Sequence, residues 1–205
     1  MSYNAFAEFY DGLTGNVEYK DRAEYIEKLI KSFGREAGTT LDLACGTGSL
    51  TLELYRRGFD IFGVDASIDM LSEAQQKCSE DEQILFICQK MQRLNLASEI
   101  DTCICTLDSI NHLTNPKDVK ETFKRVAKYL SKEGLFIFDV NTLYKHREVL
   151  CDNCFVFDTD EVFCSWQNEL DKETDIVNIT LDFFIPDENG LYFRETEEFS
   201  ERAYS

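Results

Sequence analysis

Two glycines and one carboxylate have the spacing of a ligand-binding site. Gly46 and Gly48 follow a short apolar run of strand type, 39–43, and lead directly into a helical pattern. Glycine has no Cβ, so the backbone can approach a ligand closely, and a helix start presents unpaired N–H groups to negative charge. Asp65 ends a second strand-like run 19 residues after Gly46, where a carboxylate can accept hydrogen bonds from a ribose diol. The spacing therefore predicts a nucleoside site at the carboxyl ends of parallel strands.

The glycine pattern also indicates which kind of nucleoside fits. Thr51 stands where the dinucleotide fingerprint G-x-G-x-x-G has its third glycine, and the chain contains no G-x-x-x-x-G-K-[ST] phosphate loop. Both missing patterns serve to bind pyrophosphate or a phosphate chain. The sequence therefore favours a nucleoside without phosphates and disfavours a nicotinamide oxidoreductase.

Four segments, in this order, resemble the motifs of class I S-adenosylmethionine-dependent methyltransferases. The segments are Leu41–Gly48, Val64–Ser67 with Met70–Leu71, Leu107–Leu113 and Gly134–Asn141. The resemblance extends over most of the chain, from Tyr10-Asp11 to the last residue. It implies an enzyme whose cofactor is S-adenosyl-L-methionine and whose N-terminal helices pack over that cofactor.

The resemblance also implies which residues bind the cofactor. They are Tyr10, Asp42, Ala44, Gly46, Gly48, Asp65, Ala66, Met70, Gln89, Met91 and Leu107. Asp42 would act indirectly, by holding the loop or reaching the methionine ammonium through water. Tyr10 and Met70 could instead be ordinary core residues. Lys90 stands where relatives usually carry an acidic acceptor for the adenine amino group, so Gln89, the backbone or a neighbour would have to accept instead.

Methyl transfer from a sulfonium is an in-line displacement with a neutral leaving group. The protein therefore mainly aligns the nucleophile and excludes water, and a general base is needed only if the acceptor arrives protonated. His112 is the candidate base, with Asp108 and Tyr144 behind it, and the alternative is that His112 satisfies a local hydrogen bond. Trp166 and Tyr204 could line the acceptor pocket, although core packing is the simpler role for Trp166.

Strand-like runs alternate with helical patterns through the first 141 residues, which predicts an α/β fold with a doubly wound, mostly parallel sheet. An N-terminal helix should carry Tyr3, Phe6, Phe9, Tyr10 and Leu13 on one face. The next should carry Ile26, Leu29, Ile30 and Phe33. Ser67 is the expected N-cap of a later helix. A further helix is expected to begin at Asn115-Pro116 and to stop at Gly134.

After Asn141 the pattern changes to strands without intervening helices. Asn189-Gly190 is a strong hairpin signal, and we expect a small antiparallel lid over the acceptor site. The predicted division is a cofactor-binding domain at 1–141 and a lid at 142–205. The closing strands of the family are not found before the last residue. This favours a truncated chain over a partner or the lid covering the exposed strand edge, and a homodimer through the lid or that edge is possible.

Composition excludes several classes of function. A net charge of −18 repels phosphate backbones, so nucleic acid is not an expected partner. The sequence has no apolar run near ~18 residues and no signal peptide pattern, so we expect no membrane partner, a cytoplasmic location and eight reduced cysteines. Cys151, Cys154, Cys164 and His146 could supply zinc ligands. A lone C-x-x-C is a weak signal, and no metal is expected.

The sequence thus predicts a methyltransferase that acts on a small-molecule acceptor. The alternative is a non-catalytic or regulatory S-adenosylmethionine-binding protein, suggested by Lys90 and by the absent closing strands.

Overall fold

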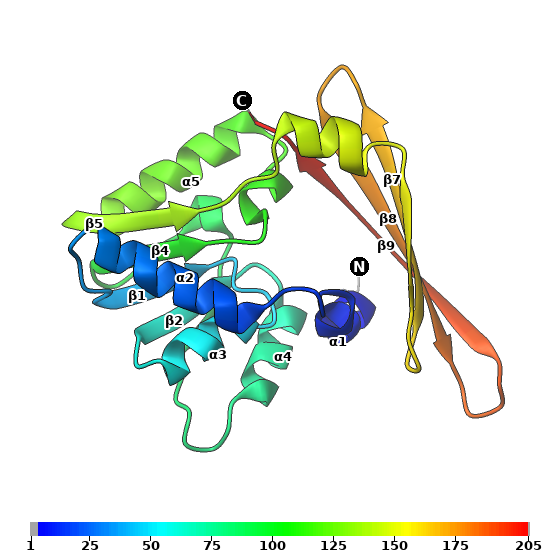
Figure 1. Ribbon diagram of the computed structural model, residues 1–205, viewed down its shortest axis with the longest axis horizontal. Helices are drawn as coiled ribbons and strands as arrows, with labels where there is room; N and C mark the ends of the chain where they lie inside the picture. Colours follow the sequence, from blue (N-terminus) through cyan, green and yellow to red (C-terminus); the bar gives the residue numbers. More distant parts are fainter. Residues whose placement is uncertain (1–3, 205) are drawn as a thin grey trace.

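The computed structural model describes residues 4–204, and its centre is a parallel five-stranded sheet (Figure 1). The strand order is β3-β2-β1-β4-β5, and all four neighbouring pairs are parallel. The strands are β1 Thr39–Leu43, β2 Asp60–Asp65, β3 Phe86–Cys88, β4 Ile100–Cys105 and β5 Leu130–Phe138. Because the order reverses beside β1, the carboxyl ends of β1 and β4 form the crevice where such sheets bind ligands.

Helices cover both faces of this sheet (Figure 1). The helices are α1 Asn4–Leu13, α2 Tyr19–Ser32, α3 Ser49–Arg56, α4 Ile68–Lys77 and α5 Pro116–Tyr129, with short 3₁₀ turns η1 Met91–Arg93 and η2 Ser109–His112. Along β4, Cys103 and Cys105 belong to the cluster that contains α5 residues, while Ile104 packs with residues of α2 and α3. Both faces of β4 are therefore buried, and the predicted doubly wound α/β class is confirmed.

Local signals located the starts of two helices correctly. The Ser67 side chain accepts a hydrogen bond from the Met70 N–H at 3.3 Å and caps α4, as expected. Asn115 caps α5 in the same way through Lys117.

Two details of the sequence reading were wrong. Helix α5 ends at Tyr129, and Gly134 lies inside β5, where a Cβ would approach the Asp101 carbonyl oxygen to 2.7 Å. Gly134 therefore allows β5 to lie close to β4 and does not stop the helix. Phe33 follows α2 and is 61% exposed, so it does not belong to the buried face of that helix. Tyr3, placed on the first helix by its spacing, lies outside the described residues.

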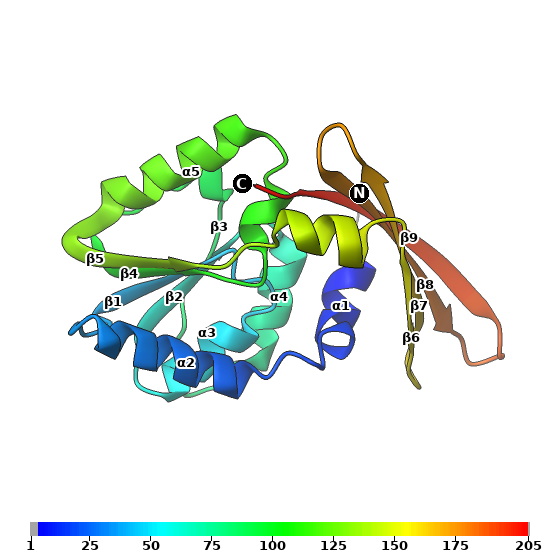
Figure 2. The same cartoon turned by 45° about the horizontal axis from the view of Figure 1, so that its top comes forward.

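A second, antiparallel sheet forms the lid (Figure 2). Its strands are β6 Cys154–Asp158, β7 Phe163–Asp171, β8 Ile176–Pro186 and β9 Tyr192–Arg202, in sequence order across the sheet. β9 ends at Arg202, three residues before the end of the sequence. Between the two sheets the chain forms a π-helical turn, η3 Lys145–Leu150, that the sequence pattern did not indicate.

Helix α1 lies between the parallel sheet and the lid (Figures 1 and 2). Phe9 and Leu13 of α1 belong to the apolar cluster on the lid's inner face, together with Leu181 and Phe183 of β8. The core of the lid thus includes residues from the start of the chain. The domain division at residues 141 and 142 remains a prediction. Among residues 4–204, no helix is long and apolar enough to span a bilayer.

Candidate cofactor and acceptor site

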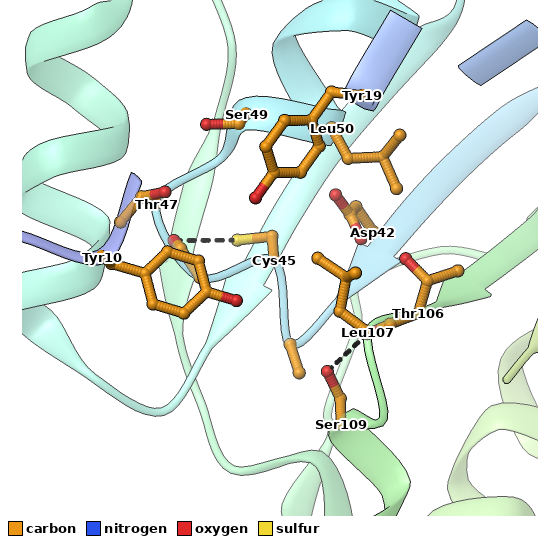
Figure 3. Close-up of a pocket in the computed structure, with 12 residues that line it drawn as sticks. Tyr10, Tyr19, Asp42, Cys45, Thr47, Ser49, Leu50, Thr106, Leu107 and Ser109 are labelled. Atoms are coloured by element: carbon orange, nitrogen blue, oxygen red, sulfur yellow. Dashed lines mark hydrogen bonds between the residues drawn. The ribbon is translucent and has the colours of Figure 1, made fainter. Parts of the chain in front are cut away.

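A pocket opens at the carboxyl ends of β1 and β4, beneath α1 and the start of α2 (Figure 3). It is lined by Tyr10, Tyr19, Asp42, Ala44, Cys45, Gly46, Thr47, Ser49, Leu50, Thr106, Leu107 and Ser109. The hydroxyl groups of Tyr10 and Tyr19 point inward from the helices, while the glycine loop and the tip of β4 form the opposite wall (Figure 3). The pocket therefore brings together five of the predicted cofactor residues from three separate segments.

The loop after β1 depends on left-handed backbone. Ala44 has φ +61°, Gly46 +54° and Gly48 +72°. Such a conformation is costly for alanine and tolerated by glycine. A Cβ on Gly46 would meet nothing within 4 Å, whereas one on Gly48 would lie 2.8 Å from the Ala74 Cβ. Gly46 thus leaves open space beside the loop, while Gly48 also allows α4 to pack against the start of α3.

Asp65, at the end of β2, has its carboxylate at this loop. One oxygen accepts from the Gly46 N–H at 2.9 Å and the other from the Ser67 N–H at 2.8 Å. Burial raises the pKa of Asp65, and these backbone hydrogen bonds oppose the rise. Each carboxylate oxygen still has a lone pair for a further donor. This arrangement fits the predicted contact with ribose hydroxyl groups.

Asp42 lies under the loop and is only 3% exposed. Its Oδ2 accepts a 2.6 Å hydrogen bond from Thr51, the residue that replaces the third glycine of the dinucleotide pattern. Burial raises the pKa of Asp42 to about 6, although the Thr51 hydroxyl counteracts the shift. The threonine thus attaches α3 to β1, a function that the sequence pattern did not reveal.

Asp11 attaches α1 to the glycine loop. Its Oδ1 accepts from Thr47 Oγ1 at 2.8 Å and from Ser49 Oγ at 3.1 Å. Lys77 of α4 forms an ion pair with Asp11 and donates to Ser49 Oγ at 2.9 Å. Asp11 was recognised only as part of the Tyr10-Asp11 pair, because its partners lie far along the sequence.

The tip of β4 is held by Asp139. The N–H groups of Leu107 and Asp108 donate to the two Asp139 oxygens at 3.1 and 2.8 Å. Leu107 and Asp108 have φ of +57° and +52°, so the carboxylate holds two strained residues in position. Arg22 of α2 pairs with Asp139 Oδ2 at 2.9 Å and brings α2 to the same point. Neither Arg22 nor Asp139 was selected from the sequence.

The expected acceptor side lies between η2 and β9. His112 Nε2 is 3.8 Å from Glu201 Oε1, and its ring lies 5.3 Å from the ring of Phe199. Asp108 Oδ2 accepts a 2.5 Å hydrogen bond from Asn141 Nδ2. Burial and the neighbouring Glu201 raise the pKa of Asp108 to about 6.

The remaining candidates are more dispersed. Tyr144 is 70% exposed, and no hydrogen bond or ion pair of the described residues joins it to His112 or Asp108. Tyr204 donates its hydroxyl to the Leu113 carbonyl oxygen at the end of η2. Trp166 donates to Asn168 at 2.8 Å and packs with Phe199 on the lid's inner face.

On the expected adenine side, Met70 is buried, while Ala66 and Lys90 are exposed. Met91 opens η1 and is half-buried. Gln89 bonds both polar atoms of its side chain to the Asn95 backbone, at 2.8 and 3.2 Å. Gln89 therefore ties the end of β3 to the segment that follows η1. Within the described part of the chain, no group of three or more His, Cys, Asp or Glu side chains is arranged to hold a metal ion.

Comparison with known proteins agrees with this geometry. Residues 40–134 match a family model described as a methyltransferase domain. The putative methyltransferase YqeM of Bacillus subtilis is 35% identical over 206 residues, which cover 100% of this chain and 81% of YqeM. A solved S-adenosylmethionine-dependent methyltransferase from Clostridium acetobutylicum superposes with a TM-score of 0.87 at 38% identity, over 99% of this chain and 82% of that one.

A more distant structure, the amino pentose methyltransferase CalS10 of Micromonospora echinaspora solved with S-adenosylmethionine bound, shares the fold with a TM-score of 0.76 at 14% identity. It covers 100% of this chain and 84% of its own.

The fold and the site define a class I S-adenosylmethionine-dependent methyltransferase, and this chain belongs to that family. S-adenosylmethionine is its cofactor, as membership of this family implies. The predicted enzyme class and cofactor are therefore confirmed.

Proposed function

We propose that the enzyme transfers the methyl group of S-adenosylmethionine to a small-molecule acceptor by in-line displacement. The observation that carries this proposal is the juxtaposition of two features. One is the pocket at the ends of β1 and β4, which Leu107 and Ser109 line. The other is the group of polar side chains Asp108, His112 and Glu201, which begins between those two residues and reaches the last strand of the lid. A methyl acceptor entering between them would meet both the cofactor and the polar groups.

The residues present fit the cofactor. Asp65 would accept from the ribose hydroxyl groups, since both of its oxygens are fixed by backbone N–H groups and retain lone pairs. Gly46 leaves space beside the loop for the ligand to approach. Asp42 would act through the loop it supports. The bound cofactor supplies an activated methyl group on a sulfonium.

The protein's part in the reaction would be alignment, exclusion of water and, for a protonated acceptor, removal of a proton. His112 is the proposed base, because it ends η2, the turn that follows the tip of β4, and its side chain is 43% exposed. Tyr10 of α1 lines one side of the pocket, and β9 of the lid packs on η2 next to His112, which supports a small acceptor over a macromolecular one. The charge of −18 further disfavours a nucleic acid.

A relative with a defined substrate supports the size of the acceptor. Glycine/sarcosine N-methyltransferase of Aphanothece halophytica is 30% identical over 138 residues, which cover 65% of this chain and 51% of that enzyme. The substrates in this name are those of the relative. For the present chain they suggest small amines as the first acceptors to assay.

The cofactor assignment is tested by calorimetric titration with S-adenosylmethionine, with NADH as the control ligand. We expect Asp65→Ala to raise the dissociation constant for S-adenosylmethionine more than tenfold, because a charge-assisted hydrogen bond contributes about 1.5–3 kcal/mol. Asp60→Asn, at the other end of the same strand, is the matched control and should bind like the wild type. Equal affinity of Asp65→Ala and wild type would contradict the ribose assignment.

The acceptor class is tested with methyl-labelled cofactor. A cell extract is separated by ultrafiltration, and each fraction is incubated with the enzyme and the labelled cofactor. Label in the low-molecular-weight filtrate supports a small acceptor. Enzyme-dependent label confined to the retained protein or nucleic acid would overturn it.

A further inference from the structure

Glu201 is a buried carboxylate that the sequence reading did not connect to the reaction. It lies one residue before the end of β9 and is only 4% exposed. The end of β9 is fixed against η2, because Asn111 donates to the Arg202 carbonyl oxygen at 2.8 Å. Tyr204 adds a hydrogen bond to the Leu113 carbonyl oxygen. The position of Glu201 is therefore set by the contact between the lid and the parallel-sheet part of the enzyme.

Both histidines of the chain face this carboxylate. His112 Nε2 lies 3.8 Å from Glu201 Oε1, and His146 Nε2 of η3 lies 3.7 Å from Oε2. His146 is fully buried, and within residues 4–204 neither of its ring nitrogens has a hydrogen-bond partner. A buried imidazole without partners is costly, and here its nearest charged group is Glu201.

An amide side chain connects Glu201 to the tip of β4. Asn141 Nδ2 donates to Glu201 Oε2 at 3.3 Å and to Asp108 Oδ2 at 2.5 Å. Burial by itself would raise the pKa of Glu201, but His146, His112 and Asn141 together hold it below its ordinary value. Glu201 therefore stays ionised although it is buried.

The structure assigns to Glu201 the part of a positioning residue for His112, an assignment that rests on the proposed role of His112 as base. The carboxylate faces the Nε2 edge of the imidazole and is placed to accept from an Nε2–H group, which would orient the ring. Nδ1 is then the nitrogen that carries the lone pair. A contact of 3.8 Å is long for a hydrogen bond, but such contacts often shorten when the substrate complex forms. Because Glu201 belongs to the lid, His112 has this partner only when β9 is docked on η2.

The proton and electron balance is simple. The acceptor's X–H bond breaks, and the proton goes to Nδ1 of His112. The released pair on X forms the X–CH₃ bond, the S–C bond breaks, and its electron pair stays on sulfur as the thioether of S-adenosylhomocysteine. The exposed part of the His112 ring then returns the proton to water.

Three carboxylates are close enough to act on His112. They are Asp65 at the end of β2, Asp108 before η2 and Glu201 on β9; a charge on His112 lowers the pKa of each. Phe199 covers one side of the ring and carries no charge. Of the three carboxylates, Glu201 is the one that has an oxygen within 4 Å of a His112 ring nitrogen among the described residues.

The test is a titration of the two imidazoles by nuclear magnetic resonance, in protein labelled at histidine. We expect Glu201→Gln to lower the pH midpoint of the His112 resonances, because an adjacent negative charge favours the imidazolium. Glu201→Asp, which keeps the charge but withdraws it by one methylene, should recover part of the shift. Glu198→Gln, on the exposed face of the same strand, is the matched control and should leave the midpoint unchanged.

An unchanged His112 midpoint in Glu201→Gln would overturn the assignment. If Glu201→Gln does not fold, Glu201→Asp decides, and a midpoint equal to that of the wild type is then the contradicting result. The calorimetric titration of wild type with S-adenosylmethionine is independent of this readout. Failure of cofactor binding would count against the proposed function, whereas failure of the midpoint shift would count against Glu201 alone.

Discussion

At the scale of single residues, the site contains carboxylates whose protonation is altered by burial. Asp42 illustrates this best, because it is buried and has one close polar side-chain partner, Thr51. A carboxylate kept in such a place costs stability when it is ionised, and this cost points to a functional reason for retaining it.

Asp42→Asn tests that reasoning. The pKa of Asp42 is raised to about 6 in the folded enzyme, above the ~4 of an unfolded chain. The folded state therefore binds more protons between pH 4 and 6, so the contribution of Asp42 to stability falls as pH rises through that window. We expect the asparagine variant to gain roughly 1–3 kcal/mol in free energy of unfolding relative to wild type at pH 7.5.

At pH 4 the two proteins should differ little, because Asp42 is then protonated in the folded state and about half protonated in the unfolded state. Urea unfolding at the two pH values measures the difference. A variant that is less stable than wild type at pH 7.5 would show that the ionised carboxylate stabilises the fold.

At the scale of elements, the two loop glycines do different work although they lie two residues apart. Both have positive φ, so any side chain is strained at either position. Only Gly48 is also crowded, by Ala74 of α4 and by the ring of Phe86. Gly48 is therefore required for the packing of α4 against the start of α3, while Gly46 leaves space on the ligand side of the loop.

Alanine at each glycine should separate these two functions. We expect Gly48→Ala to lower the free energy of unfolding by about 2–5 kcal/mol, from backbone strain and overpacking together. Gly46→Ala should cost only about 1–2 kcal/mol, because its Cβ enters open space. Thermal and denaturant unfolding give the comparison, and equal losses in the two variants would refute the packing role of Gly48.

At the scale of the whole molecule, α1 joins the two sheets. Phe9 packs on Phe183 of the lid with ring centroids 6.2 Å apart. Asp11, two residues later, bonds to the glycine loop of the parallel-sheet part. Glu197 of β9 accepts from the Phe6 N–H at 2.9 Å near the start of the same helix. Lid docking and loop geometry therefore depend on one ten-residue helix.

Phe9→Ala should loosen the lid more than the parallel sheet. Removing a buried phenylalanine costs about 3–5 kcal/mol, and the cavity would lie against β8. We expect hydrogen exchange of β8 amides to accelerate far more than that of β4 amides. Phe33→Ala is the control, because Phe33 is 61% exposed and its loss should change stability by less than ~0.5 kcal/mol. Equal acceleration in both sheets would mean that the lid does not open separately.

The sequence by itself determined the order of strands and helices, the glycine loop and the family. These features follow from local rules: period-2 and period-3.6 apolar patterns, capping residues such as Ser67, and glycines at turns. The carboxylate at the end of β2 was also predictable, because the ends of adjacent parallel strands must meet at one edge of the sheet.

Only the tertiary structure decided which side chains meet. Three contacts show this: Thr51 bonds Asp42, Asp139 holds the tip of β4, and Glu201 rather than Tyr144 lies beside His112. Each joins two segments of the chain, and no periodic pattern in the sequence indicates that they meet. The π-helical turn and the strand through Gly134 depend likewise on packing against neighbours. Local propensity selects the elements, whereas burial and hydrogen-bond satisfaction select their partners, and those interactions exist only when the chain is folded.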